Sequence, residues 1–322
     1  MFLIVRDQES LPRDVEMDSI GRVDKFSRQY PGEYIYLYRD GEEDREAEDD
    51  VKTEISAAYD KVGATAQLQG DLELAGRVMR RLGYSEDQVA AAGVDGYNYQ
   101  GVGCPHPAAG IRPGHSVLDI GSGLGVDSFI AAAAAGEAGS VVGLDISKRE
   151  VQHATERAEK RGLQNVSFVH GDMEKMPFDD DTFDVVISNG AFCLAPDKEA
   201  AFREIRRVLR PGGVFSVCCT TTKVDLDSSV HWPICMRVFM PLQQTAPLLQ
   251  NLGFTDIRVD DSDSRMTLDD DELQSPDPGP ASTSTSTSRY KIHGGTPEFE
   301  HLEQFDMNTL CARVVLSGKK PH

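Results

Sequence analysis

The stretch VLDIGSGLG, Val117–Gly125, constrains the fold more than any other part of this chain. An apolar run leads to Asp119, glycines follow at Gly121, Gly123 and Gly125, and the chain resumes as FIAAAAA. This order predicts a strand, a tight turn and a helix. Glycines allow positive φ and a close approach of the backbone to a ligand, and the first N–H groups of a helix are free to bind it. We therefore predict a nucleotide-like ligand at this turn.

A regular alternation of strands and helices follows the glycine turn. Strands are predicted at Ser140–Leu144, Val166–Val169, Phe183–Ser188, Val214–Cys218 and Thr309–Ser317, and helices at Lys148–Arg161 and Asp197–Leu209. Continuous apolar strands that alternate with helices indicate a parallel sheet covered on both faces. In such a sheet the ligand binds at the carboxyl ends of the strands.

The segments around this α/β core differ in composition. Gly32–Asp40 alternates as a strand does, a helical pattern begins at Val51 and recurs over Leu72–Leu82, and Ser85 is a predicted helix cap. Residues 262–301 are acidic and then rich in Ser, Thr and Pro, which predicts a disordered insertion. The chain is accordingly divided into an unassigned extension (1–50), the main domain with its preceding helices (51–261), the insertion (262–301), and the last strand with the tail (302–322).

The net charge and the arrangement of the cysteines indicate which classes of binding partner and which compartment to expect. The formal net charge of −20 argues against nucleic acid and anionic membranes as partners. No apolar run approaches the roughly 20 residues that span a bilayer, and MFLIV followed by Arg6 lacks the layout of a secretory signal. Six cysteines without a C-x-x-C pair fit a reducing compartment. We expect a cytoplasmic, monomeric protein that acts on a small molecule and binds neither nucleic acid nor membrane.

The spacing of the glycines separates two cofactors. The dinucleotide fingerprint is G-x-G-x-x-G, whereas this turn reads G-x-G-x-G and has Val126 where the third glycine would fall. With Asp119 two residues before Gly121, it resembles the D-x-G-x-G-x-G motif of class I S-adenosylmethionine (SAM) methyltransferases. Asp145 ends the second strand, where a carboxylate accepts the ribose hydroxyls of either cofactor. The resemblance implies SAM rather than NAD.

The same resemblance implies roles for further residues. Asp172 stands where this family contacts the adenine amino group, and Met173 beside it is suited to pack on the adenine ring. A helix cap at Asp172 and a core position for Met173 are the alternative interpretations. The full cofactor-binding set that the resemblance implies is Asp119, Gly121, Ser122, Gly123, Gly125, Asp127, Asp145, Ile146, Asp172, Met173 and Asn189.

Residues from about Val51 to Asp260 resemble the arsenite methyltransferase branch of that family. LGYSEDQVAAAG followed by GVGCPHP, ISNGAFCLAPDKEAAFREIRRVLRPGG and HWPICMRVFMPL are similar to its segment before the glycine turn, its S-N-x-x-x-x-L-x-P-D-K stretch and its W-x-x-C segment. LLQNLGFTDIRV and CARVVLSGKKP are similar to its sixth and last strands. The resemblance implies a Rossmann-like, seven-stranded, mostly parallel sheet with helices on both faces, the class I methyltransferase fold.

The resemblance also implies how a substrate is held. Trivalent arsenic is thiophilic, and its lone pair attacks the sulfonium methyl group, so the protein supplies proximity and orientation. Cys104 and Cys235 stand at the family's arsenic-binding cysteines and are the implied arsenic ligands. The family's third cysteine follows the Ser-Asn pair, but here Gly190 follows Asn189. Cys193, three residues further on, is a substitute candidate.

Other interpretations stay open. Free cysteine is among the most buried residue types, so we expect Cys218, Cys219 and Cys311 in the core. We expect His106 as a solvated loop residue and Trp232 as a packing residue. A SAM-dependent methyltransferase of an organic small molecule and a non-catalytic SAM-binding protein are the alternatives to arsenite methylation. A NAD-binding enzyme is disfavoured by the glycine spacing.

Overall fold

The computed structural model describes residues 72–226, 238–266 and 305–322 without gaps, and outside these ranges residues 4–5, 23–27, 34–38, 51–53, 55–57, 230, 232, 236, 268–269 and 289–290. The chain divides into two units, Met1–Glu54 and Ile55–His322. In the first unit, β1 (Ile4–Val5), β3 (Tyr34–Tyr38) and β2 (Val23–Ser27) form an antiparallel sheet in that order. The strand predicted within Gly32–Asp40 is therefore confirmed.

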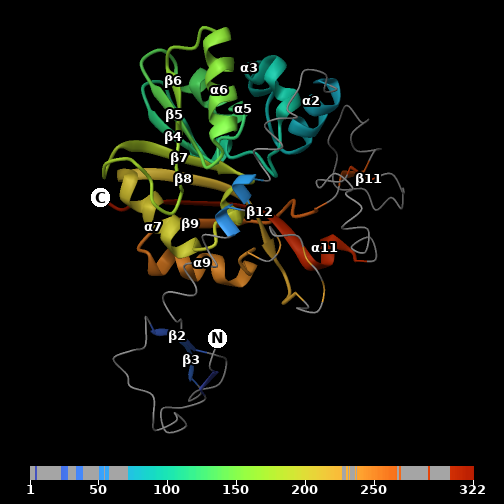
Figure 1. Cartoon of the computed structure of the whole chain (residues 1–322), viewed down its shortest axis with the longest axis vertical. Helices are drawn as coiled ribbons and strands as arrows, with labels where there is room; N and C mark the ends of the chain where they lie inside the picture. The colour runs from blue at the N-terminus through green and yellow to red at the C-terminus, as the bar shows by residue number, and fades with distance from the viewer. Residues whose placement is uncertain are drawn as a thin grey trace. The chain divides into compact units, whose positions relative to one another are not determined.

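The second unit is built on a seven-stranded sheet with the order β6-β5-β4-β7-β8-β12-β9 (Figure 1). Its strands are β4 (Ser116–Ile120), β5 (Ser140–Asp145), β6 (Val166–His170), β7 (Phe183–Asn189), β8 (Leu209–Thr222), β9 (Thr255–Asp260) and β12 (Cys311–Lys319). The first five in chain order pair in parallel, and β12 runs antiparallel to β8 and β9. The predicted fold class is confirmed.

The strand order reverses between β4 and β7. From β4 the chain proceeds outward through β5 to β6, then returns to β7 on the other side of β4 and continues to β8. Loops that leave β4 and β7 therefore turn in opposite directions, which opens a crevice at their carboxyl ends. The glycine turn follows β4 directly, so it lies at this switch point.

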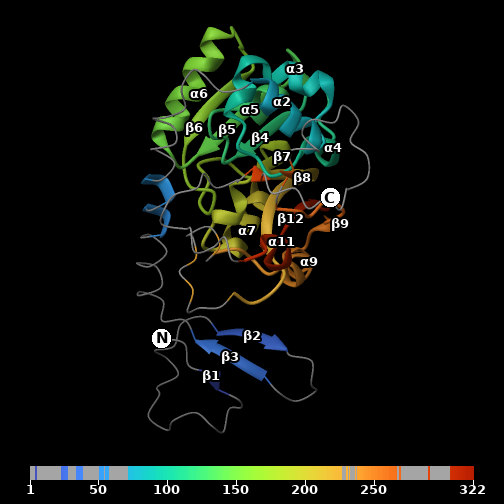
Figure 2. The same cartoon turned by 90° about the vertical axis from the view of Figure 1, so that its right-hand side faces the viewer.

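Helices lie on both faces of the sheet (Figures 1 and 2). On one face, α4 (His106–Ala109) and α5 (Val126–Ala135) share a core cluster with Val117, Val141 and Val185. Val185 pairs with Val214 in β8, so Phe215, the next residue, points to the opposite face. There Phe215 contacts Phe202 of α7 (Lys198–Val208) and Phe254, which follows α9 (Leu242–Asn251).

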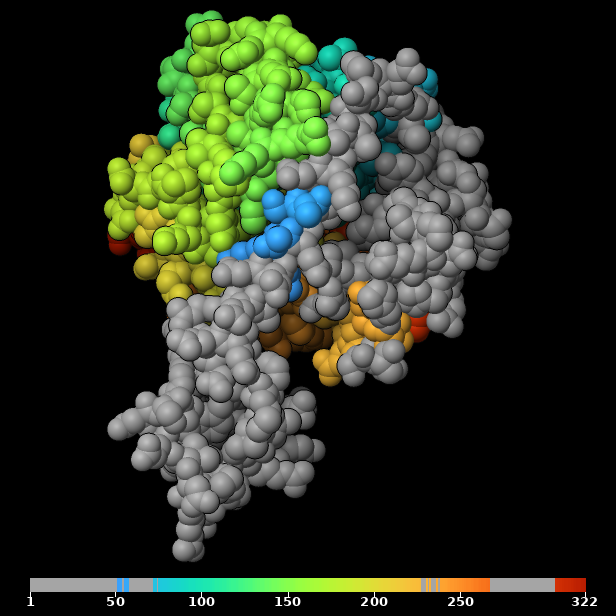
Figure 3. All heavy atoms as spheres, in the orientation of Figure 1, coloured from blue at the N-terminus to red at the C-terminus, as the bar shows by residue number. Residues whose placement is uncertain are grey.

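The remaining elements flank this core. They are α2 (Leu72–Arg81), α3 (Glu86–Ala92), η3 (Gly93–Asn98), α6 (Lys148–Lys160), η4 (Phe192–Leu194), α11 (Met307–Leu310), and the paired strands β10 (Leu268–Asp269) and β11 (Arg289–Tyr290). The polar helix α6, in light green, lies on the surface in the space-filling view (Figure 3). No helix within the described ranges is both long and apolar enough to cross a membrane.

The helices before β4 match the predictions, whereas the last parallel strand is longer than predicted. The helix predicted over Leu72–Leu82 is α2, and Ser85 caps α3 through a capping box with Gln88. β8 is longer than predicted at both ends, because Leu209 pairs with Phe183 of β7 and Thr222 pairs with Cys311 of β12. Residues 262–266 of the predicted insertion are described, and Asp263 among them binds Arg81 and Arg313. Most of the insertion, including Ser275–Ser288, lies outside the described residues.

Candidate functional site

The glycine turn joins β4 to α5 at the carboxyl edge of the sheet. Gly121, Gly123 and Gly125 have φ of 67°, 51° and 90°. A Cβ at Gly121 would lie 2.0 Å from the Cβ of Ala191, and one at Gly125 would lie 2.8 Å from Cζ of Phe168. Glycine is therefore required at both positions, because a side chain would strain the backbone and collide with the neighbouring loop or strand.

Gly123 differs from its two neighbours because its outer side is open. A Cβ at Gly123 would meet nothing closer than the Oε1 atom of Glu150, at 3.8 Å. Its N–H donates to Oδ2 of Asp145 at 2.8 Å, and the N–H of Ser147 donates to Oδ1 at 2.8 Å. Burial raises the pKa of the Asp145 carboxyl, while these backbone hydrogen bonds act in the other direction. The carboxylate at the end of β5 is thus held beside the glycine turn.

Asp119, in β4, contacts the helix on the other side of the glycine turn. Its side chain is buried, and Oδ2 accepts a hydrogen bond of 2.6 Å from the Ser128 hydroxyl in the first turn of α5. Burial, together with the nearby Asp127 carboxylate, raises the pKa of Asp119 to about 8. The structure therefore joins Asp119 to the helix that follows the turn.

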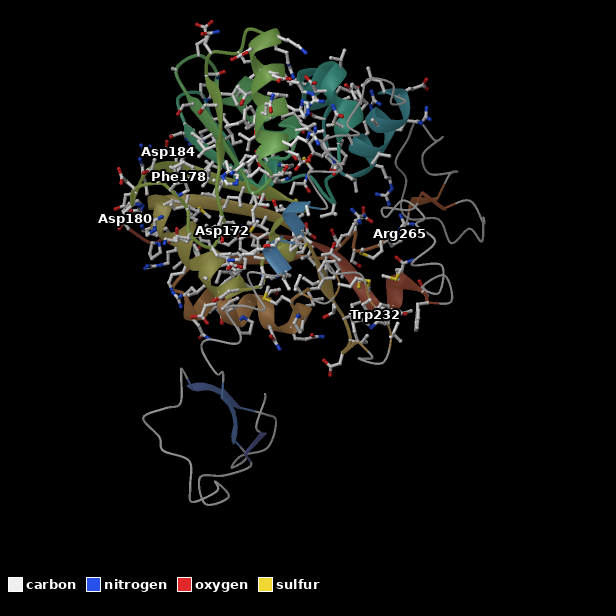
Figure 4. The ribbon with its side chains drawn as sticks, viewed as in Figure 1. Asp172, Phe178, Asp180, Asp184, Trp232 and Arg265 are labelled. Carbon is white, nitrogen blue, oxygen red and sulfur yellow. The ribbon has the colours of Figure 1, made fainter. Side chains whose placement is uncertain are left out.

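Asp172 and Met173 follow β6 and are both half-buried. Oδ1 of Asp172 accepts a hydrogen bond of 2.9 Å from the N–H of Glu174, so the carboxylate caps its own turn. This contact matches the capping interpretation of Asp172. In Figure 4, Asp172 lies near the middle of the molecule, whereas Asp184 at the start of β7 lies at its edge.

The side chains around the turn fit an adenosyl cofactor. Asp145 offers carboxylate oxygens for hydroxyl donors, and half-buried Ile146 and Met173 offer apolar surface. The Ser122 hydroxyl is buried and has no hydrogen-bond partner, and a buried polar group without a partner is uncommon. With the open side of Gly123, this set provides polar groups and apolar surface for the expected ligand.

A buried polar network joins the turn to the segment that precedes β4. Oδ1 of Asp127 lies 2.6 Å from the Tyr84 hydroxyl, which donates to it, and 2.8 Å from Nε2 of His106. Oδ2 of Asp127 accepts a hydrogen bond of 3.0 Å from Nδ2 of Asn189. The expectation of a solvated His106 is wrong: its side chain is buried, because Asp127 binds it from the first turn of α5. No pattern in the sequence indicated this contact.

The Cys104 thiol points into an apolar cluster. Met79, Tyr84, Ala92, Val126 and Ile130 are its buried neighbours. Its Sγ lies 3.9 Å from Oε1 of Gln88. Burial raises the pKa of the Cys104 thiol to about 12, so the thiol is protonated at neutral pH in this conformation.

Two of the other described cysteines, Cys218 and Cys219, belong to β8. Cys218 and Cys219 are successive strand residues and point in opposite directions. A Cβ on Gly103 would lie 3.0 Å from Sγ of Cys218, so Cys218 faces the Cys104 segment. Cys219 instead lies near Cys193, whose Sγ donates to the carbonyl of Gly190 at 3.2 Å. The structure therefore does not bring Cys193 to Cys104.

Cys218, Cys219 and Cys311 are buried, as predicted. Cys235 lies outside the described residues. Trp232, which Figure 4 labels, lies three positions before it. Its ring packs against Phe305 with ring centroids 5.0 Å apart, as expected of a packing residue. Within the described part of the chain, no group of three or more His, Cys, Asp or Glu side chains is arranged to hold a metal ion.

Sequence reasoning missed Lys198, which is buried beside the Cys193 loop. Its ammonium donates to the carbonyl oxygens of Cys193 at 2.9 Å, Val238 at 2.8 Å and also Ala195. Burial lowers the pKa of Lys198 to about 8. The P-D-K motif, in which Asp197 caps α7, was the available signal.

Comparisons with known proteins agree on the fold. Residues 111–237 match a family of methyltransferase domains. The chain is 43% identical to an arsenite methyltransferase of Halobacterium salinarum over 135 residues (41% of this chain, 34% of the relative). It is 32% identical to that of Aquipseudomonas alcaligenes over 214 residues (63% and 62%). It is also 45% identical to a sterol 24-C-methyltransferase of Gibberella zeae over 109 residues (34% and 28%).

A solved structure has the same fold. It is assigned as a sarcosine dimethylglycine methyltransferase from Galdieria sulphuraria, with a TM-score of 0.50 and 21% identity, over 66% of this chain and 81% of that one. The chain spans between about a third and two thirds of the length of the arsenite methyltransferases described above.

Proposed function

Because residues 111–237 match a family of methyltransferase domains, we propose that this chain is a class I SAM-dependent methyltransferase that methylates trivalent arsenic held by cysteine thiolates. The cofactor of the domain is SAM, which supplies a methyl group activated by its bond to a sulfonium sulfur. The observation that carries the proposal is the similarity to two arsenite methyltransferases at 43% and 32% identity. In this proposal Cys104 and Cys235 are the arsenic ligands.

In this proposal the glycine turn and the strand ends hold the cofactor. Asp145 accepts hydrogen bonds from the ribose, while Ile146 and Met173 cover the adenine. Gly121, Gly123, Gly125 and Ser122 supply backbone close to the methionine part, and Asp172 accepts from the adenine amino group. Asp119 supports the turn through Ser128. These residues contribute by orienting the cofactor toward the acceptor. No strong general base is needed, because the nucleophile is the lone pair of arsenic and carries no proton.

Each arsenic–sulfur bond forms by exchange. Trivalent arsenic in water carries hydroxyl groups, and the proton of a Cys104 or Cys235 thiol leaves with one of them as water. An arsenic–sulfur bond thereby replaces an arsenic–oxygen bond. The high pKa of Cys104 is compatible with this step, because the departing hydroxyl takes the proton.

The test is an assay of the full chain with SAM, arsenite and a small thiol, followed by speciation of the arsenic. We expect methylated arsenic from the natural protein and strong loss of it in Cys104→Ser and Cys235→Ser. Cys311→Ser is the matched control, because Cys311 is buried in a separate cluster with Trp232 and Met236. A preparation that binds SAM but yields no methylated arsenic contradicts the proposal.

An organic small molecule is the second candidate acceptor. Two observations favour it: the Cys104 thiol is buried among apolar side chains, and Gly190, at the place of the third cysteine, has a φ of 77°. In this alternative the cysteines are packing residues and do not bind the substrate. Release of S-adenosylhomocysteine with a panel of small organic acceptors would then survive Cys104→Ser.

We further propose a cytoplasmic monomer, on the basis of the net charge of −20 and the dispersed cysteines. We also propose the domain division that the sequence predicts: an N-terminal extension (1–50), the main domain with its preceding helices (51–261), an insertion (262–301), and the last strand with the tail (302–322). Light scattering coupled to size exclusion tests the monomer, for which we expect the mass of one chain, 35.3 kDa.

A further inference from the structure

The backbone of Val102 and Gly103, just before Cys104, is held by side chains from distant elements. Oδ1 of Asn189 accepts hydrogen bonds from the N–H of Val102 at 2.9 Å and of Gly103 at 3.2 Å. The Gly103 carbonyl accepts from Nδ2 of Asn189 at 2.8 Å and from the Tyr99 hydroxyl at 2.7 Å. Arg313 of β12 donates to the Val102 carbonyl at 2.7 Å. All four backbone polar groups of these two residues therefore bind side chains.

The glycines of G-V-G-C make this close approach possible. A Cβ at Gly101 would lie 2.2 Å from Nδ2 of Asn189 and 2.5 Å from the Tyr99 hydroxyl. A Cβ at Gly103 would lie 3.0 Å from Sγ of Cys218. Real Cβ atoms do not approach other heavy atoms to 2.2 Å, so any side chain at Gly101 would push the segment away from Asn189.

Both the oxygen and the nitrogen of the Asn189 side-chain amide have hydrogen-bond partners. Beyond the segment, its Nδ2 lies 3.0 Å from Oδ2 of Asp127 and 2.9 Å from the Tyr84 hydroxyl. Both oxygen and nitrogen are thus engaged within a partly buried network, and such networks resist rearrangement because a lost partner leaves a buried polar group unsatisfied. The Asn189 side chain therefore has protein partners on both its oxygen and its nitrogen, and its expected role in cofactor binding stays a prediction.

Asp127 fixes the other end of the same segment. It binds Nε2 of His106, two residues after Cys104, at 2.8 Å. Cys104 is consequently held on both sides, by Asn189 through residues 102–103 and by Asp127 through His106. These two side chains start from β7 and α5, the elements that border the crevice at the switch point.

We propose that Asn189 is a positioning residue, assisted by Asp127, that fixes the segment carrying Cys104 against the crevice between β4 and β7. The role assigned to Cys104 rests on the proposed function. The positioning of its thiol does not, because it is measurable without any acceptor.

The experiment is the rate of alkylation of Cys104 by iodoacetamide in the full chain, read by mass spectrometry of its peptide. In Asn189→Ala we expect Cys104 to react about tenfold faster, because local opening of the segment becomes easier. The buried Cys311 is the internal standard and should react at an unchanged rate. In the second variant, Gly101→Ala, SAM affinity measured by calorimetry should change less than about threefold, a free-energy difference below about 0.7 kcal/mol.

A second variant approaches the contact from the other side. Gly101→Ala places its methyl group against Asn189 and should also accelerate alkylation of Cys104, even if Asn189→Ala fails to fold. Gly162→Ala is the control, because an added Cβ there meets nothing within 4 Å, so the change strains the backbone (φ 67°) without a collision. It should leave the Cys104 rate unchanged.

Exchanging the amide and the carboxylate between positions 189 and 127 distinguishes a specific positioning role of Asn189 from a general loss of stability. Asn189→Asp sets two carboxylates against each other at Asp127, and should accelerate alkylation more than Asn189→Ala. Adding Asp127→Asn restores one amide and one carboxylate, and should recover part of the protection. Such recovery in a double-mutant cycle shows that the two side chains are energetically coupled.

The outcomes are distinct. An unchanged Cys104 rate in both Asn189→Ala and Gly101→Ala overturns the proposal, and so does a large loss of SAM affinity without a change in that rate. Faster alkylation with retained SAM binding supports it whether or not arsenite is methylated. Where arsenite is methylated, the natural protein and Asn189→Ala should differ mainly in KM for arsenite.

Discussion

Among single residues, Asp119 shows how burial decides the role of a carboxyl group. It belongs to the motif predicted to bind the cofactor, yet its Oδ2 accepts a hydrogen bond from Ser128, and burial raises its pKa to about 8. An ordinary aspartate titrates near 4. The buried carboxyl therefore keeps its proton in the folded protein over a pH range in which the unfolded chain has lost it.

This difference predicts a pH dependence of stability. Between about pH 4 and pH 8 the folded state binds more protons at Asp119 than the unfolded state, so its contribution to the unfolding free energy falls as pH rises. In Asp119→Asn that decline should be absent. Calorimetric melting temperatures of the two proteins at pH 5, 6, 7 and 8 should therefore diverge, with the variant gaining relative to the natural protein as pH rises. A constant difference across this range would disprove the assignment.

Among the elements, α5 depends on the glycine that begins it. Gly125 is its N-cap, with φ 90° and ψ 11°, and it packs against Phe168 and Phe129. Ser128 in the first turn binds Asp119, while Asp127 beside it binds the segment before β4. One helical turn therefore orders the cofactor turn and the Cys104 segment together.

Gly125→Ala should destabilise the protein by roughly 2 kcal/mol or more, because left-handed strain adds to overpacking. The matched change is Gly110→Ala at the end of α4. Gly110 is also left-handed (φ 59°, ψ 42°), but an added Cβ there meets nothing within 4 Å, so only about 1 kcal/mol of strain is expected. Urea unfolding measures both, and calorimetry should show weaker SAM binding in Gly125→Ala alone. Equal effects of the two changes would contradict the steric argument.

On the scale of the second unit, a buried ion-pair group joins the helices before β4 to the sheet domain. Asp95 in η3 lies 3.2 Å from Arg157 and 3.2 Å from Arg161, both from the α6 region. Arg161 also donates to the carbonyls of Ala91 and Ala92 and lies over the ring of Phe129, 4.6 Å from its centroid. These contacts fix the position of the layer that delivers Tyr84 and Cys104.

Asp95→Ala should therefore cost about 3 kcal/mol of unfolding free energy, because it leaves two partly buried guanidinium groups without their carboxylate. Glu73→Ala is the control: Glu73 pairs with Arg77 on the surface of α2, and its side chain is 83% exposed. Such an exposed pair contributes about 0.5 kcal/mol or less. Urea denaturation of both variants gives the comparison, and a cost at Asp95 no larger than that at Glu73 would refute this role of the ion-pair group.

The parts of the fold that local patterns control could be predicted. Apolar strands, the G-x-G-x-G turn, the capping Ser85 and the helix over Leu72–Leu82 depend on residues close in the chain, so periodicity and turn chemistry identify them. Asp145 was correctly placed at the end of β5 for the same reason. Cys235 and most of residues 262–301 lie outside the described residues, and their roles stay predictions.

What only the tertiary structure decided is which polar groups meet across the switch point. The sequence by itself determined the α/β fold and the cofactor turn, because neighbouring residues specify strands, turns and caps. It did not determine that His106 is buried on Asp127, that Asn189 holds the Cys104 segment, or that Cys193 and Cys104 are on different sides of β8. Those facts depend on strand order and on which face each residue takes, and both are set by packing between segments far apart in the chain.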